Sequence, residues 1–233
     1  MALLTLPIVE ARRETPRNLV VRLGLGDHPF DFRAGEHVLL GDVGGGDRRP
    51  YSIASAPVHV ARSRALEFLI QVDANDSPGP HLRRLVAGVS LDVEGPAGDF
   101  TLPGDPAARS YLFVAGGTGV APIRSMLWQV LETQPAACVG LVQTARSAED
   151  LSYAAEFRAL AGDGRIRLLE SVTREAGAWG GMRGRVGAAQ LAPLIAGPDT
   201  LAFVCGPDSL VEEVPLLLSA LGVRETRTEH WAG

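Results

Sequence analysis

The chain contains little cysteine. Its 233 residues include two, Cys138 and Cys205, which lie far apart in the sequence. Two thiols are too few for a disulfide framework, and they also exclude a four-thiolate iron–sulfur cluster held by this chain alone. We interpret Cys138 as a small hydrophobic core residue, because its surroundings carry no chemical motif.

Long hydrophobic runs are also lacking. No stretch approaches the roughly 18 uninterrupted apolar residues of a membrane span. The segment Met1–Glu14 lacks a basic n-region, and Pro7 interrupts its short apolar run, so it has the pattern of a strand and not of a secretory signal. We therefore expect a cytoplasmic protein with no membrane partner.

Neither sign of charge is in large excess. The formal net charge of -5 gives no whole-molecule reason to expect nucleic acid as a partner. Hydrophobic residues make up 46% of the chain and charged residues 21%, a composition that favours a packed core over disorder. The length fits one large domain or two of ordinary size.

Residues 1–105 contain short β-rich runs separated by turn residues. The runs are 18–25, 36–40, 66–72 and 89–94, with clusters of Gly, Asp, Asn and Pro between them. Frequent short strands of this kind predict an antiparallel β-barrel or sandwich. One helix is expected within this part, and its apolar side is formed by His81, Leu82, Leu85 and Val86.

The pattern changes after the segment around Gly104. Four apolar runs have the composition of strands buried on both faces: 111–115, 139–143, 166–169 and 201–205. They alternate with helical stretches at 122–133, 150–160, 187–195 and 207–221. This alternation predicts an α/β domain with a doubly wound parallel sheet. We thus expect two domains, 1–105 and 106–233.

A glycine-rich segment, Gly116–Pro122 (GGTGVAP), directly follows the first of these runs and opens a helix. Glycines let the backbone approach a pyrophosphate, and a helix N-terminus offers free N–H donors. Pro122 suits the first turn of a helix. A plain strand-to-helix turn remains an equal alternative, because the segment lacks the usual G-x-G-x-x-G spacing.

Two shorter motifs are compatible with nucleotide chemistry. In Arg49-Pro50-Tyr51-Ser52 the Arg can bind a phosphate, the Tyr can stack on a planar ring, and the Ser can hydrogen-bond a ring nitrogen. Taken alone, an exposed Arg beside an ordinary strand Tyr is the more common arrangement. Val204–Pro207 (VCGP) ends the last buried strand, on the sheet edge where ligands bind, although a free Cys there is usually a buried hydrophobe.

The three motifs together, in this order along nearly the whole chain, resemble the ferredoxin–NADP⁺ reductase superfamily. Supporting segments are Phe32–Glu36, Gly95–Phe100, Val172–Glu175 and Gly184–Val186. The resemblance implies a stand-alone NAD(P)H-dependent flavoprotein reductase with an N-terminal flavin-binding barrel and a C-terminal NAD(P)-binding α/β domain. Its implied cofactors are FAD and NADP or NAD.

The resemblance also implies roles for individual residues. Arg49, with Pro50, would bind flavin phosphate, Tyr51 would stack on the isoalloxazine, and Ser52 would lie at flavin N5. The residues expected to receive the dinucleotide are Gly117, Thr118, Gly119, Pro122, Cys205, Gly206 and Pro207. Cys205 would lie beside the nicotinamide, which must approach flavin N5 to within about 3–3.5 Å.

The chain ends in a segment similar to the acidic-x-aromatic terminus of plant-type members, Glu229-His230-Trp231. By that match Glu229 is a candidate proton relay, and Trp231 is a candidate aromatic cover over the nicotinamide face. An edge-strand anchor is an equal alternative for Trp231. Ala232-Gly233 beyond it departs from the plant-type ending.

Basic residues follow the second and third predicted strands of the α/β domain. Arg146 follows the second and Arg174 the third, and Arg185 is a possible third cation. No Asp or Glu closes the second strand, so the carboxylate that would bind a ribose 2′-hydroxyl is absent. The pattern favours NADPH over NADH, although Glu149 and Asp150 lie just beyond Arg146.

One departure from the family pattern bears on how the flavin is held. Members that hold FAD usually carry Gly-x-x-Ser/Thr at the start of the barrel helix, whereas here Gly79 is followed by Leu82 at the hydroxyl position. Backbone N–H groups there, or Ser77, are possible substitutes.

Three functions therefore stay open. The leading hypothesis is a reductase that passes single electrons to a separate ferredoxin or oxygenase iron–sulfur protein. The second is an NAD(P)H:flavin oxidoreductase that uses flavin as a diffusing substrate, and the third is a non-catalytic flavin- or nucleotide-binding subunit. No metal site is expected.

Overall fold

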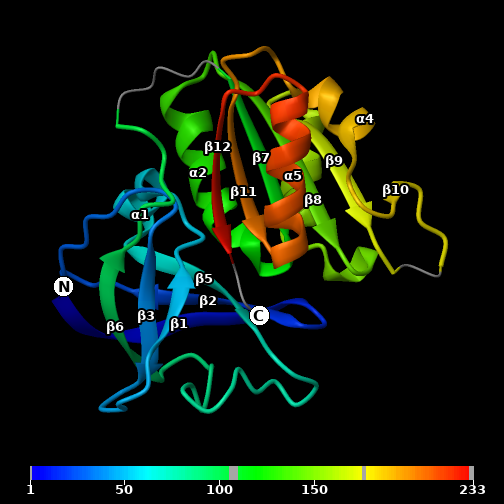
Figure 1. Cartoon of the computed structure of the whole chain (residues 1–233). Coiled ribbons are helices and arrows are strands. Elements are labelled where there is room, and N and C mark those ends of the chain that lie inside the picture. The colour runs from blue at the N-terminus through cyan, green and yellow to red at the C-terminus, as the bar shows by residue number, and fades with distance from the viewer. Residues whose placement is uncertain (1, 105–109, 175–176, 231–233) are drawn as a thin grey trace.

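Two β-sheets form the framework of the computed structural model, which describes residues 2–104, 110–174 and 177–230 (Figure 1). The first is a six-stranded sheet with the order β4-β3-β6-β1-β2-β5, and all of its neighbouring strands pair antiparallel. Its strands are β1 (Ala2–Thr15), β2 (Asn18–Gly24), β3 (His37–Asp42), β4 (Arg49–Ser52), β5 (Ala65–Gln71) and β6 (Ser90–Ala97). The two edges meet where Ile53, just after β4, bridges Phe68 of β5. The predicted antiparallel barrel is confirmed.

The second sheet is parallel, with the strand order β10-β9-β8-β7-β11-β12. Its strands are β7 (Ser110–Gly116), β8 (Cys138–Ala145), β9 (Arg167–Val172), β10 (Met182–Arg183), β11 (Leu201–Gly206) and β12 (Glu225–His230). The connecting helices are α2 (Val120–Thr133), α3 (Ala154–Gly162), α4 (Ala188–Leu191) and α5 (Asp208–Ala220). The strand order reverses at β7, so the predicted doubly wound sheet is confirmed.

Alternate residues of the parallel strands face opposite sides of this sheet. In β7, Tyr111 and Phe113 pack with α2 and α3, whereas Leu112 and Val114 pack with α4 and α5. Helices therefore cover both sides of β7, which explains why this central strand is apolar along nearly its whole length. Among the described residues, no helix is both long and apolar enough to cross a membrane.

The helix expected around His81–Val86 is not formed. These residues follow an irregular path between β5 and β6, and the described helix of the barrel domain is instead α1 (Pro57–Ser63). His81, Leu82 and Leu85 are buried, and Asp42 binds this segment: its N–H donates to the His81 carbonyl at 3.0 Å and its Oδ1 accepts from the Arg83 N–H at 3.1 Å. Contacts with the barrel thus replace the bonds within a helix.

The two domains share apolar contacts. One cluster contains Val20, Ala54 and Leu69 of the barrel domain together with Val120 and Ile123 of α2. The two domains are therefore packed on each other, and in Figure 1 the arrowheads of β11 and β12 point toward the barrel. The predicted boundary at residues 105 and 106 lies outside the described residues and stays a prediction.

The prediction for Cys138 was wrong. It was expected in the core, but it is exposed. It is the first residue of β8 and pairs with Ser110, the first residue of β7, at the amino edge of the sheet where the helices no longer cover the strands.

Candidate active site

A cavity of about 750 Å³ opens at the carboxyl edge of the parallel sheet. The residues of the α/β domain that line it end or follow β7, β8, β9 and β11, and include Gly116, Gly117, Thr118, Thr144, Ala145, Arg146, Thr173, Arg174, Pro207 and Ser209. Arg17, Asn18 and Gln71 line it from the barrel domain. The cavity thus lies at the switch point of the sheet, where open α/β sheets bind ligands, and is closed on one side by the barrel.

The glycine-rich segment forms a tight turn between β7 and α2, and Gly116, Gly117 and Thr118 of this turn line the cavity. Gly117 has a φ of +56°, a conformation that favours glycine. At Gly119 an added Cβ would lie 2.4 Å from the carbonyl oxygen of Cys205, so only glycine lets the turn pack directly on the end of β11. The turn leads into α2, and Pro122 lies in the first turn of that helix, where its missing N–H removes no bond.

Two of the expected cations have free guanidinium groups. Within the described residues, Arg146 and Arg174 both line the cavity and neither forms an ion pair or side-chain hydrogen bond. Arg185 also lines the cavity, but its guanidinium is bound to Glu213. Asp150 lies in the cavity wall as well and accepts a hydrogen bond from Ser147 Oγ at 3.0 Å.

The residues of Arg49-Pro50-Tyr51-Ser52 form β4, at the edge of the barrel sheet. Arg49 is largely exposed and lies 3.6 Å from Asp47. Ser52 is buried, and its Oγ has no hydrogen-bond partner. A buried hydroxyl without a partner carries a free-energy cost that a ligand can remove.

Tyr51 is held by a residue that the sequence prediction assigned to a helix. Its hydroxyl lies 2.8 Å from His81 Nε2, and the two rings stack with centroids 5.8 Å apart. Burial raises the pKa of Tyr51 to about 12, so the phenol stays neutral. Burial, with Arg49 adding to it, lowers the pKa of His81, whose Nδ1 is buried without a partner.

The segment after β5 offers no hydroxyl at the predicted position. Leu82 is fully buried among the hydrophobic residues of the barrel core. Gly79 has a φ of +112°, and a Cβ added to it would lie 3.4 Å from His81 Nδ1. No sequence pattern distinguished His81 from its neighbours, because its role depends on the contact with Tyr51, 30 residues away.

The end of β11 brings together a thiol and a carboxyl group. Cys205 is paired in register with Glu229 of β12, and its Sγ donates to Glu229 Oε2 at 4.0 Å. Burial, and then the carboxylate of Glu229, raise the pKa of Cys205 well above its usual value. Burial, and then Asp99 of the barrel domain, raise the pKa of Glu229 to about 7. Cys205 is therefore a neutral thiol, and Glu229 exchanges a proton near neutral pH. Trp231 lies outside the described residues.

Helix α2 connects the chain just after β4 with the end of β11. Arg124 Nη1 donates to the Ala54 carbonyl at 2.9 Å, and Ser125 Oγ donates to the Ser55 carbonyl at 2.8 Å, so α2 is bound to the chain just after Ser52. The turn that begins α2 packs on Cys205 through Gly119. The exit of β4, the glycine-rich turn and the end of β11 are thereby held in one region between the domains.

Comparison with known proteins decides the family. Residues 113–215 match the model of the oxidoreductase NAD-binding domain. The chain is 40% identical to ferredoxin–NADP reductase B of Sorangium cellulosum over 205 residues, which are 83% of this chain and 82% of that protein. The chain belongs to the ferredoxin–NADP reductase family.

Other relatives extend beyond this chain. It is 30% identical to the glycine betaine monooxygenase reductase subunit of Chromohalobacter salexigens over 85% of its own length, but it spans 55% of that protein. Among solved structures, a ferredoxin NADP⁺ reductase from Neisseria gonorrhoeae with bound FAD and NADP superposes with a TM-score of 0.79 and 20% identity over 99% of each chain. That similarity is one of fold. The chain is an NAD(P)H-dependent flavoprotein reductase, as the resemblance implied.

The residues of the reductase fit its two cofactors. For the flavin, the barrel edge offers a neutral Tyr51 ring and two buried polar atoms without partners, Ser52 Oγ and His81 Nδ1. For the dinucleotide, the cavity offers a glycine turn at a helix N-terminus and free guanidinium groups. These are the polar groups that a flavin ring and a phosphate group respectively would engage.

Proposed function

We propose that this reductase receives hydride from NADPH on a tightly bound FAD and passes single electrons to a separate iron–sulfur protein, either a ferredoxin or an oxygenase component. The observation that carries the proposal is the pair of α2 contacts, which hold the strand of Tyr51 and Ser52 next to the strand end of Cys205. A hydride donor and a flavin bound at these two places would be neighbours. FAD supplies the chemistry that converts one hydride into two single electrons.

The proposed roles follow from the state of each side chain. Arg49 is exposed and binds flavin phosphate, Tyr51 stacks on the ring system, and the partnerless Ser52 Oγ hydrogen-bonds the ring edge. Cys205 is a neutral thiol that packs against the nicotinamide without attracting a counter-ion. Glu229 donates or accepts a proton near neutral pH.

The choice of partner is supported by the relatives. Ferredoxin–NADP reductase B is named for a ferredoxin, and the glycine betaine relative is the reductase subunit of a monooxygenase. The two cysteines of the present chain do not suffice for a cluster of its own. A separate protein would then supply the cluster.

One observation favours the alternative, a reductase for diffusing flavin. Leu82 is fully buried, and it stands where family members that hold FAD carry a hydroxyl, so that position presents no hydroxyl to a pyrophosphate. The two functions differ in how firmly FAD is held, and that is measurable directly.

The test uses protein desalted after purification. We expect a flavin chromophore in the desalted protein, and NADPH-dependent reduction of an added [2Fe–2S] ferredoxin without any added flavin. A colourless protein whose NADPH oxidation saturates with added riboflavin or FMN would support the diffusing-flavin function instead.

A further inference from the structure

The turn between β1 and β2 carries a cation into the dinucleotide cavity. The backbone of Arg17 is fixed in this turn: its N–H donates to Thr15 Oγ1 at 3.2 Å, and its carbonyl accepts from the Val72 N–H at 2.8 Å. The side chain is partly buried and lines the cavity, although the residue belongs to the barrel domain.

The turn is also bound to the opposite wall. Asn18 Nδ2 donates to Ser152 Oγ at 3.1 Å, and Glu14 Oε1 accepts from the Tyr153 N–H at 2.7 Å. Ser152 and Tyr153 belong to the loop that follows β8 and Arg146. Bonds on both sides of Arg17 therefore hold this turn against that loop, and both Arg17 and Asp150 of the loop line the cavity.

Free guanidinium groups are rare in this protein. All 22 basic residues are arginines, and in the described part of the chain most bind a carboxylate or a backbone carbonyl. Those whose guanidinium has no hydrogen bond or ion pair are Arg17, Arg84, Arg146 and Arg174. Three of the four line the same cavity.

The charge balance of the cavity wall supports an anionic ligand. Its ionisable side chains are four arginines and two carboxylates, and one of the carboxylates, Glu213, is already bound to Arg185. Arginines held near one another without counter-ions repel, and a phosphate relieves that repulsion through charge-assisted hydrogen bonds.

We propose that Arg17 binds a phosphate group of the nicotinamide dinucleotide, so that the barrel domain contributes to the dinucleotide site and to the affinity for the cofactor. The inference rests on the proposed function, because it takes the cavity as the dinucleotide site. The phosphate is either the pyrophosphate, present in both dinucleotides, or the 2′-phosphate of NADPH alone.

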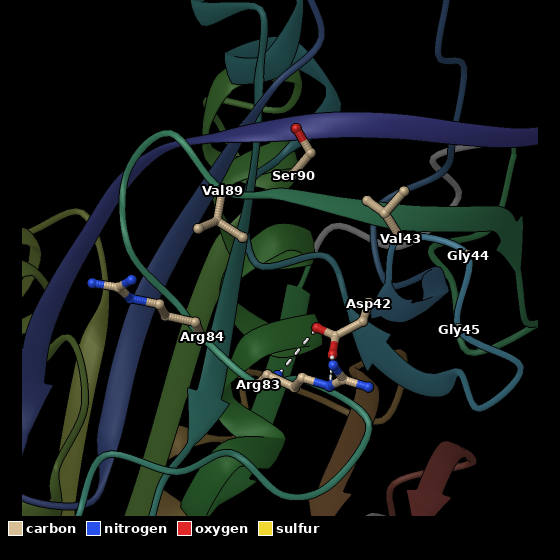
Figure 2. Close-up of a pocket in the computed structure, with 8 residues that line it drawn as sticks. All are labelled: Asp42, Val43, Gly44, Gly45, Arg83, Arg84, Val89 and Ser90. Carbon is tan, nitrogen blue, oxygen red and sulfur yellow. Dashed lines mark hydrogen bonds and ion pairs between the residues drawn. The ribbon is translucent and has the colours of Figure 1, made fainter.

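Binding of the oxidised dinucleotides tests this without turnover. Isothermal titration of the flavin-loaded protein with NADP⁺ and with NAD⁺ compares wild type, Arg17→Ala, Arg17→Lys and Arg84→Ala. Arg84 is the matched control: it is a free arginine of the same domain, but it lines a separate pocket of about 370 Å³ with Asp42 and Arg83 (Figure 2).

We expect Arg17→Ala to weaken binding about tenfold, which corresponds to about 1.4 kcal/mol. Arg17→Lys should recover part of the loss, Arg84→Ala should bind as wild type does, and added salt should shrink the difference between wild type and Arg17→Ala. Loss for both dinucleotides assigns Arg17 to the pyrophosphate, and loss for NADP⁺ alone assigns it to the 2′-phosphate.

Unchanged affinity in Arg17→Ala overturns the inference, as does an equal loss in Arg84→Ala. If Arg17→Ala folds poorly, Arg17→Gln keeps the length of the side chain and removes its charge, and the same comparison applies. Failure of the wild type to bind either dinucleotide would instead contradict the proposed function, so the two failures are distinguishable.

Discussion

Glu229 and Cys205 contact each other at the end of β11, and the pKa values of both groups are raised. Burial, and then Asp99, raise the pKa of Glu229 to about 7, from an ordinary value of 4.5. The thiol beside it stays protonated because burial raises its pKa well above 9.0. The carboxyl group is therefore the member of the pair that exchanges a proton near pH 7.

The raised pKa of Glu229 predicts a pH-dependent stability. The folded state holds the proton more tightly than the unfolded state, so this group's contribution is fully present below pH 4.5 and is lost as the pH rises through about 7. Glu229→Gln keeps a neutral side chain at every pH. We expect the unfolding free energy of the variant to rise relative to that of wild type as the pH increases from about 5 to about 8.

Urea unfolding at several pH values measures this difference. Glu225→Gln serves as the control, because Glu225 is an exposed residue of the same strand. A constant difference between Glu229→Gln and wild type across the range would show that the carboxyl group of Glu229 titrates normally.

Arg146 bears on the preference between NADPH and NADH. Its free guanidinium lies in the cavity wall after β8, where no carboxylate closes the strand. We expect Arg146→Ala to lose about five- to tenfold in kcat/KM with NADPH and to keep its efficiency with NADH, since a partly exposed charge pair contributes about 1 kcal/mol. Steady-state kinetics with both cofactors measures this. An equal loss with the two cofactors, or none, contradicts the assignment.

The glycine-rich turn acts as one element together with the end of β11. An added methyl group at Gly119 would meet the Cys205 carbonyl oxygen at 2.4 Å, and that oxygen is a backbone atom with little room to move. We expect Gly119→Ala to destabilise the protein by about 1–3 kcal/mol and to weaken dinucleotide binding, because the turn must move away from the strand end.

Gly162→Ala is the matched control for this element. Gly162 ends α3, and an added Cβ there would meet no atom within 4 Å. Thermal unfolding of the two variants gives the comparison. Equal unfolding temperatures for Gly119→Ala and wild type would mean that the turn and β11 do not pack as closely as described.

The sequence predicted elements well where hydrophobic pattern and burial agree. Strands β7, β8 and β11 are largely buried and β9 partly so, and their apolar runs predicted them within a few residues. Strand β12 was missed because its residues, ETRTEH, are polar on an edge strand. The prediction of a helix near His81 was wrong. The apolar residues that suggested it, such as Leu82 and Leu85, are buried in the barrel core by a segment that is not helical.

At the scale of the whole molecule, an interdomain ion-pair network holds the two halves of the site together. Arg124 of α2 lies 3.1 Å from Glu67 of the barrel domain and 2.8 Å from Glu156 of α3, and its side chain is 12% exposed. Its guanidinium also lies over the ring of Tyr153, 4.5 Å from the centroid. One side chain thus binds both domains.

We expect Arg124→Met to destabilise the protein by about 3–5 kcal/mol, because it removes the nearest cation from two largely buried carboxylates. Arg62→Ala is the control, since Arg62 and Glu132 also join the two domains but the Arg62 side chain is 72% exposed. We expect a change within about 0.5 kcal/mol there. Chemical denaturation of both variants measures the difference, and similar losses would contradict the role given to Arg124.

This arrangement also explains what the sequence could not predict about the site. The motifs of β4, the glycine turn and β11 were found because each is a short segment with its chemistry in consecutive residues. Arg17 and His81 were not, because each depends on a partner or a cavity formed by distant parts of the chain.

We expect hydride to reach the flavin at the end of β11, beside Cys205. Anaerobic rapid mixing of the flavin-loaded protein with NADPH, followed by flavin absorbance, tests it most directly in wild type and Cys205→Ala. We expect rapid bleaching in wild type, and at least tenfold slower bleaching in the variant with unchanged flavin content and unchanged NADP⁺ affinity. Equal rates in the two proteins, or no bleaching of the wild type by NADPH or NADH, would contradict it.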